Sequence, residues 1–212
     1  MPSPSNNQPQ FRLASQSPRR AALLHTAGYI FTQQHPPFDD PPTPEFEEDL
    51  AAAEIATRLA VRKAQSLANA KPAPLLTLAA DTLCVDEAGG LIGKPVDVHD
   101  ARAILQSFIG KTHRVVTGVA LLPADAAPVT FADSATVAIN QLEDGELEQY
   151  LESKSWEGKA GAYNLFERQS AGWPILTIGD PTTIVGLPMD RLTAALAEFD
   201  IHPANPSPLH PA

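Results

Sequence analysis

Cysteine is almost missing from this sequence of 212 residues, in which Cys84 is the single example. One cysteine cannot form an intramolecular disulfide, and it excludes the zinc sites that need two or more thiolates. Because Cys84 lies inside an apolar run, we expect it to be a small buried hydrophobic side chain and not a reactive thiol.

Long hydrophobic segments and an excess of positive charge are lacking as well. No run approaches the roughly 20 apolar residues that a membrane helix needs, and residues 1–10 carry no apolar stretch typical of a secretory signal. We therefore expect a cytoplasmic protein with no membrane partner. The formal net charge of −10 disfavours nucleic-acid binding, which needs a basic surface to displace counterions from phosphate.

Several sequence signatures of common enzyme folds are also absent. There is no GxxxxGK[ST], GxGxxG or GxSxG segment, so P-loop, Rossmann and hydrolase-elbow interpretations lack their motifs. The six histidines show no spacing typical of zinc ligands. If the ligand is an anion, basic residues must be gathered locally against the acidic average, which makes each clustered arginine or lysine informative.

Between residues 11 and 200, short β-like runs alternate with helical patterns, which predicts an α/β fold in a single domain. The proline-rich ends, 1–10 and 201–212, have the composition of disordered tails. The expected strands cover 11–14, 75–85, 114–122, 135–141, 175–178 and 183–185. The expected helices cover 18–26, 47–70, 99–109, 144–153 and 188–199.

The first candidate for chemistry is the segment Ser-Gln-Ser-Pro-Arg-Arg at 15–20. Ser17 is a good N-cap and Pro18 suits the first helical position, so Arg19 and Arg20 fall in a first turn, where positive charge opposes the helix dipole. The arrangement becomes favourable if a polyphosphate binds at the helix end, because guanidinium groups bind phosphate oxygens in pairs and Ser15 can add a hydroxyl donor. On this segment alone, an ordinary solvated helix start is an equally good interpretation.

Lys63 lies in one i, i+4 row with Ile55, Leu59 and Leu67 on the predicted helix. A lysine within an apolar stripe either extends its amine to solvent, which is the commoner outcome, or meets an anion.

Asp81 interrupts the apolar run 75–85, which predicts a strand buried on both faces. A carboxylate there is costly unless it is paired, binds a metal or does chemistry. It could hold Mg²⁺ or take a proton from attacking water, or it could serve only to accept hydrogen bonds from nearby backbone amides. Lys94, in a Gly-Lys-Pro loop, could reach a phosphate as a point charge.

Two further segments are weaker candidates. The acidic pair Asp39-Asp40 could contribute to a metal site, although a solvated loop is the better interpretation of the pair on its own. The small residues of 158–162 allow a backbone to approach a ligand closely, and Tyr163 could stack on it or donate to it.

In combination, these segments resemble the Maf family of nucleoside triphosphate pyrophosphatases over about residues 11–199. The resemblance rests on eight short motifs in the same order and spacing. They are LASxSPRR (13–20), an acidic pair (39–40), RLAxxKA (58–64), ADT (80–82), GKP (93–95), THxVxTGV (112–119), KAGAY (159–163) and VGLP (185–188).

The resemblance implies a mixed, twisted sheet with surrounding helices, in two lobes that flank a nucleotide cleft, and often a homodimer. It implies hydrolysis between the α- and β-phosphates of a nucleoside triphosphate, dependent on a divalent cation such as Mg²⁺ or Mn²⁺. By motif, Asp81 is the general base and a metal ligand, and Asp40 is the second metal ligand. The residues implied to surround the triphosphate are Ser15, Arg19, Arg20, Lys63 and Lys94.

The resemblance also bears on the base. In the branch of the family that acts on dTTP and UTP, specificity positions match Arg20 and Thr82, whereas Phe166 stands near the place of an expected glutamine. We therefore expect a pyrimidine or a modified nucleotide as substrate. A hydrolase for non-canonical purine triphosphates and a non-catalytic nucleotide-binding regulator of cell division are the alternatives.

Overall fold

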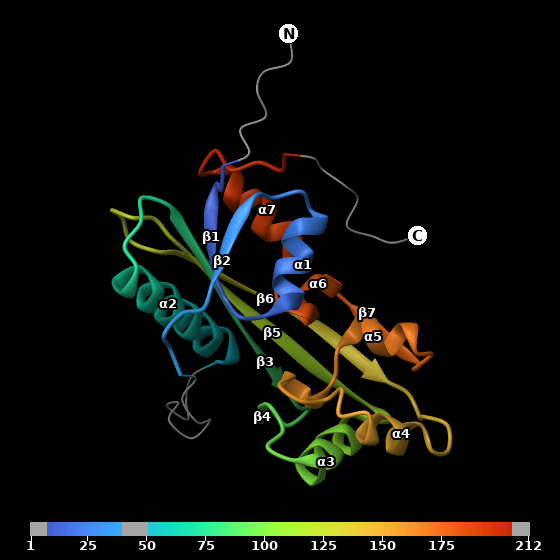
Figure 1. The fold of residues 1–212 in the computed structure, drawn as a ribbon. Helices are drawn as coiled ribbons and strands as arrows, with labels where there is room; N and C mark the ends of the chain where they lie inside the picture. Colours follow the sequence, from blue (N-terminus) through green and yellow to red (C-terminus); the bar gives the residue numbers. More distant parts are fainter. Residues whose placement is uncertain (1–7, 40–50, 205–212) are drawn as a thin grey trace.

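A mixed sheet of seven strands runs through the protein, whose computed structural model describes residues 8–39 and 51–204 (Figure 1). The strand order is β2-β1-β3-β5-β6-β7, and β4 pairs with β3. β1 is parallel to β2 and β3, and the remaining pairs are antiparallel. The strands are β1 (Phe11–Ala14), β2 (Phe31–Gln34), β3 (Leu76–Val85), β4 (Leu91–Ile92), β5 (Lys111–Leu122), β6 (Val129–Ile139) and β7 (Ile175–Ile178).

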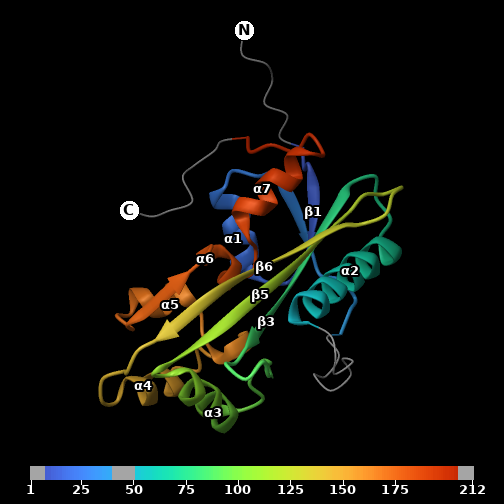
Figure 2. The same ribbon diagram turned by 180° about the vertical axis from the view of Figure 1, so that it is seen from behind.

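Helices surround this sheet, as Figures 1 and 2 show from opposite sides. They are α1 (Pro18–Thr26), α2 (Ala52–Ala70), α3 (Val98–Phe108), α4 (Glu146–Glu152), α5 (Leu165–Ser170), α6 (Pro181–Val185) and α7 (Met189–Ala197), with a short 3-10 helix, η2 (Ala160–Ala162). The expected class, an α/β fold with a mixed sheet, is confirmed.

Two of the three clusters of buried apolar side chains among the described residues lie at opposite ends of the sheet, and the third lies between α2 and the sheet. One cluster joins β1 to α1 and α7 and includes Phe11, Leu24 and Met189. The other joins the far ends of β5 and β6 to α3, α4 and α5, with Phe108 and Leu165 among its members. The two end clusters form two lobes, which the long strands β3, β5 and β6 connect (Figures 1 and 2).

Helix α2 lies directly on the sheet because β5 carries a glycine beneath it. A Cβ atom added to Gly118 would lie 2.3 Å from the backbone nitrogen of Thr57. The apolar stripe of α2 buries Ile55, Leu59 and Leu67 against the strands. The close approach fixes the height of α2 above β3 and β5.

The segment 183–185, expected as a strand, belongs instead to helix α6. Its β-branched residues favour a strand, but local capping decides otherwise. The side chain of Asp180 accepts a hydrogen bond from the amide of Thr182, Pro181 occupies the first turn, and Gly186 ends the helix in a left-handed conformation. A strand prediction based on side-chain type alone was therefore wrong here.

Other elements differ from expectation in extent. β2 and α5 were not predicted, and β6 begins six residues before the expected start at 135. The chain also packs beyond the expected domain end at 200, because Ile201 is buried in the first cluster. The rest of the expected tails, 1–7 and 205–212, lies outside the described residues.

Within the described ranges, every helix is too short or too polar to cross a lipid bilayer.

Candidate functional site

A cavity of about 420 Å³ opens where β1 ends and β3 continues. β1 pairs with β3 only as far as Leu13 and Leu78, and the chain then leaves the sheet towards α1. The carboxyl ends of parallel strands are the usual place for a ligand crevice in α/β sheets. The cavity is lined from both lobes, by residues 14–20 on one side and by Lys94, Gly158, Tyr163 and Asn164 on the other.

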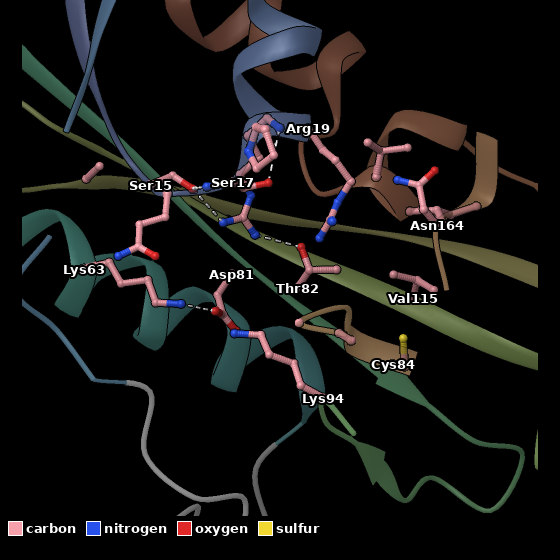
Figure 3. Close-up of a pocket in the computed structure, with 18 of the residues that line it drawn as sticks. Ser15, Ser17, Arg19, Lys63, Asp81, Thr82, Cys84, Lys94, Val115 and Asn164 are labelled. Atoms are coloured by element: carbon pink, nitrogen blue, oxygen red, sulfur yellow. Dashed lines mark hydrogen bonds and ion pairs between the residues drawn. The ribbon is translucent and has the colours of Figure 1, made fainter. Parts of the chain in front are cut away.

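The structure brings most of the predicted site residues to this one cavity (Figure 3). Those that line it are Ser15, Arg19, Arg20, Lys63, Asp81, Thr82 and Lys94. They come from four separate segments of the chain, so the sequence order alone does not place them together. Asp40 lies outside the described residues.

Helix α1 begins at the cavity in the predicted way. Ser17 caps it, with its hydroxyl 3.4 Å from the backbone amide of Arg20, and Pro18 stands in the first turn. Arg19 and Arg20 therefore project from the first turn, as the sequence predicts, and both reach the cavity. The positive charges stand at the helix end to which an anion is attracted.

The guanidinium of Arg20 is held in place by several hydrogen bonds. Nε donates to the carbonyl of Gly186 at 2.9 Å, and Nη2 donates to the Thr82 hydroxyl at 3.1 Å. Nη1 donates to Ser15 Oγ at 3.3 Å. Ser15 Oγ also accepts from the amide of Ser17 at 3.1 Å, so the hydroxyl hydrogen of Ser15 is the part that it can offer to an anion.

Lys63 meets an anion inside the protein. Its Nζ atom lies 2.5 Å from Oδ1 of Asp81, and the two side chains are 12% and 10% exposed (Figure 3). Of the two interpretations of this lysine, the ion pair holds and the solvent-directed side chain does not. Asp81 itself is 7% exposed on β3, as its place in an apolar strand predicts.

Phe166 does not reach the cavity. Asn164, two residues earlier, caps α5 by accepting from the amide of Glu167 at 3.0 Å, and it is Asn164 that lines the cavity. The helix then carries Phe166 away, and its side chain is 37% exposed. An asparagine three residues before a glutamate is a helix-capping signal. This signal would have predicted α5 and, with it, that Asn164 and not Phe166 faces the cavity.

One wall of the cavity is apolar and was not predicted as part of the site. It includes Val115, Ile184 and Val185, together with Cys84. Cys84 is 2% exposed, and burial raises the pKa of its thiol to about 12. The thiol therefore stays protonated near neutral pH, which confirms the expectation of a small buried hydrophobic side chain.

The described lining is rich in positive charge. It includes Arg19, Arg20, Lys63 and Lys94, and among the described residues its one carboxylate is that of Asp81. In a chain of net charge −10, this gathering of cations favours a polyanionic ligand. An apolar wall beside it suits a ligand with both a charged and an uncharged part.

A divalent cation such as Mg²⁺ prefers oxygen ligands, and the described lining offers the carboxylate of Asp81. The described residues contain no group of three or more His, Cys, Asp or Glu side chains placed to hold a metal. Mg²⁺ commonly binds through one or two carboxylates, with water and substrate phosphates completing the shell. Asp81 fits that role, and the carboxylate of Asp40 is the sequence-predicted addition to it.

The chain is similar to known proteins over most of its length. A model of the family described as "Maf-like protein" matches residues 10–199. A protein of Shouchella clausii named dTTP/UTP pyrophosphatase is 37% identical over 195 residues, which cover 91% of this chain and 97% of that protein. Proteins of the same name from Alkaliphilus oremlandii and Salinibacter ruber are 33% and 36% identical, covering 91% and 87% of this chain and 98% and 88% of those proteins.

A solved structure, described as a HAM1 protein from Coxiella burnetii, has the same fold. The TM-score is 0.50 at 19% sequence identity, over 90% of this chain and 100% of the other.

Proposed function

Because the chain belongs to the Maf family, we propose that it is a nucleoside triphosphate pyrophosphatase. The reaction is attack of water on the α-phosphorus, which releases a nucleoside monophosphate and pyrophosphate. The observation that carries the proposal is the carboxylate of Asp81, the one buried carboxylate among the described residues, within a cavity lined by four cationic side chains.

In this mechanism Asp81 is the general base. Lys63 donates to Oδ1 of the carboxylate, and this carboxylate takes the proton from the attacking water. Lys63 keeps the carboxylate at a fixed position on β3 while that proton moves. Loss of a positioned base of this kind costs about 10²–10⁴-fold in rate.

The basic side chains bind the polyphosphate. Arg19, Lys94 and the hydroxyl of Ser15 supply donors at the end of α1 and on the opposite loop. The α-phosphorus of a triphosphate is shielded by negative charge, which repels an incoming hydroxide. These cations offset that repulsion and stabilise the charge that develops on the departing pyrophosphate.

We propose that a divalent cation, Mg²⁺ or Mn²⁺, is required and is held by Asp81 together with Asp40. When bound, such a cation adds electrostatic stabilisation of the phosphate oxygens. The support is Asp81, the single carboxylate of the described lining, because Mg²⁺ commonly binds through one or two carboxylates and takes its other ligands from substrate phosphates and water.

For the base, we propose dTTP and UTP or related pyrimidines. The relatives named dTTP/UTP pyrophosphatase support this choice, and so do Arg20 and Thr82, which are hydrogen-bonded to each other in the cavity wall. Phe166 has no place in this proposal, because it lies outside the lining. Non-canonical purine triphosphates remain the alternative substrate class.

A substrate panel tests the proposal. The purified protein is incubated with Mg²⁺ and with UTP, dTTP, CTP, ATP, GTP and dITP, and pyrophosphate and monophosphate are both measured. We expect UTP and dTTP to have the highest kcat/KM. A tenfold advantage for any purine triphosphate contradicts the pyrimidine assignment, and release of orthophosphate in place of pyrophosphate contradicts the reaction itself.

The regulator hypothesis is tested by Asp81→Asn, which keeps the shape of the side chain and removes the base. We expect turnover to fall by about 10²–10⁴-fold, with binding of UTP retained in calorimetry. If the wild type binds triphosphates and never cleaves them with Mg²⁺ or Mn²⁺, the protein is a binder and not an enzyme.

Assembly and cellular location stay predictions. Light scattering of the purified protein tests the predicted homodimer. Fractionation of the source cells tests the predicted cytoplasmic location.

A further inference from the structure

A chain of hydrogen bonds leads from the cavity wall into the interior of the sheet. The hydroxyl oxygens of Thr82 and Thr117 lie 2.9 Å apart on neighbouring strands. Thr117 Oγ1 lies 2.7 Å from the backbone carbonyl oxygen of Thr183. The hydroxyl of Thr183 donates to Oδ2 of Asp133 at 2.7 Å. Thr117 and Thr183 are fully buried.

The direction of this chain follows from the chemistry of its far end. A carbonyl oxygen only accepts, so Thr117 must donate its single hydroxyl hydrogen to Thr183. Thr117 then has no hydrogen left for Thr82. The 2.9 Å contact therefore requires that Thr82 donates and Thr117 accepts.

This direction fixes which hydrogen bonds the Thr82 hydroxyl can still form. A hydroxyl has one hydrogen and two acceptor positions. The hydrogen is committed to Thr117, and one acceptor position takes the hydrogen bond from Nη2 of Arg20 at 3.1 Å. Thr82 lines the cavity (Figure 3), and what it can offer a ligand there is one acceptor.

An acceptor-only Thr82 cannot be a phosphate ligand, because phosphate oxygens near neutral pH are acceptors too. In a nucleotide the donors are the N–H groups of the base and the hydroxyls of the sugar. Uracil and thymine both carry an N3–H donor, whereas the 2′-hydroxyl is present in UTP and absent from dTTP. The donors that both nucleotides share are N3–H and the 3′-hydroxyl. Only N3–H distinguishes uracil and thymine from cytosine, so a residue that selects the base contacts N3–H.

We propose that Thr117 is a positioning residue for base recognition: it holds the Thr82 hydroxyl as an acceptor for the N3–H of uracil or thymine. This inference rests on the proposed pyrimidine specificity. It also gives a reason for rejecting cytosine, whose N3 is an acceptor and would face the acceptor of Thr82. Leaving two acceptors in contact without a proton is costly in a partly buried site.

The test measures binding and not only turnover. The α,β-methylene analogues of UTP and CTP, which resist cleavage at the α–β position, are titrated into the wild type and variants by calorimetry with Mg²⁺. Thr117→Val keeps the shape of the side chain and removes the acceptor for the Thr82 hydrogen, so that hydrogen becomes available to N3 of cytosine. We expect the preference for the UTP analogue to fall about tenfold in T117V.

Matched variants separate the effect of the hydrogen-bond direction at Thr82 from the effect of side-chain packing at Thr117. Thr117→Ser retains the hydroxyl and is expected to keep the wild-type preference. Thr82→Val removes the acceptor, and in its background T117V should change the preference no further. If T117V does not fold, the smaller variant Thr117→Ala replaces it and is compared with T117S.

The outcomes distinguish a failure of the inference about Thr117 from a failure of the proposed reaction. A wild type that binds the analogues equally, or binds neither, overturns the inference about Thr117, and so does a folded T117V with the wild-type preference. If the preference exists and falls in T117V while UTP is never cleaved, the inference stands and the proposed reaction fails.

Discussion

The contact of Lys63 with Asp81 links side-chain chemistry to the proposed function most directly. Each of these side chains is close to nine-tenths buried, and each would be costly to bury without the other. The pair therefore combines a structural role with the placement of Asp81, the proposed general base. Lys63 reaches Asp81 because the apolar row of α2 faces β3.

This coupling predicts a particular pattern of stabilities. Lys63→Met leaves the carboxylate of Asp81 without its partner, and we expect the free energy of unfolding to fall by about 1–3 kcal/mol. The double variant K63M/D81N removes both charges and should recover most of that loss. Urea denaturation measures both. Equal losses in the single and double variants would show that the unpaired carboxylate of Asp81 is not what destabilises K63M.

A second buried group predicts a dependence of stability on pH. His113 stacks on Phe108 with ring centroids 3.8 Å apart, and its Nε2 lies 2.8 Å from the hydroxyl of Tyr163. Burial lowers the pKa of His113 from 6.5 to about 4. Between these values the unfolded chain binds a proton that the folded chain does not, so acidification through this window destabilises the fold.

We expect His113 to contribute up to ~1.4 kcal/mol per pH unit to the loss of unfolding free energy below pH 6.5. His113→Gln should reduce that slope, measured by urea denaturation at several values between pH 7 and 4.5. His99→Gln, at an exposed position in α3, is the control and should leave the slope unchanged. A slope that is the same in H113Q and the wild type contradicts the assignment.

At the scale of single residues, the site residues that could be predicted from the sequence are those whose chemistry conflicts with their surroundings. Lys63 in an apolar row and Asp81 in an apolar strand are conflicts of this kind, and both meet in the cavity. Asn164 and Thr117 offer no such conflict, because polar residues of their size are common at caps and in strands. Their roles depend on neighbours from distant parts of the chain.

At the scale of elements, the packing of α2 on β5 depends on the lack of a side chain at Gly118. Gly118→Ala would place a Cβ atom 2.3 Å from the backbone of Thr57, so the helix must move. We expect a loss of about 1–3 kcal/mol in unfolding free energy and a fall in kcat, since α2 carries Lys63. Thermal denaturation and turnover measure these effects.

The comparison variant for this prediction is Ser134→Ala on β6, where the side chain is exposed. It should change neither quantity appreciably. If G118A has wild-type stability and activity, α2 is free to shift, and its contact with the sheet does not position the site.

Elements with strong local signals could be predicted from the sequence. The cap of Ser17 and Pro18 gave the start of α1, and the apolar run gave β3 nearly to its ends. α6 could not be predicted from side-chain type, because Asp180 and Gly186 override the strand preference of the residues between them. β2 shows only partial burial, and its pairing with β1 is non-local.

At the scale of the whole molecule, an acidic protein presents a locally basic cavity. The net charge of −10 repels a polyphosphate at long range, whereas Arg19 and its neighbours attract it within the site. Salt screens both effects over about 10 Å at 0.1 M, and the closer attraction dominates binding.

We therefore expect KM for the triphosphate to rise about 3–10-fold between 50 and 500 mM NaCl at constant Mg²⁺, with kcat changing less than about twofold. Arg19→Gln should raise KM at low salt and make its rise with salt shallower. Lys71→Gln, which alters a charge outside the cavity lining, is the control. A KM independent of salt contradicts an electrostatic role for the lining.

The two ends of the described chain meet at the edge of the first lobe. The side-chain amide of Gln10 donates to the carbonyl of His202 at 3.0 Å, and the amide of Ala204 donates to the carbonyl of Gly28 at 2.8 Å. The two ends of the described chain therefore lie close together, which is the geometry that circular permutation needs. A circularly permuted gene that opens in the turn between β5 and β6, away from the cavity lining, would encode the same sheet and the same site.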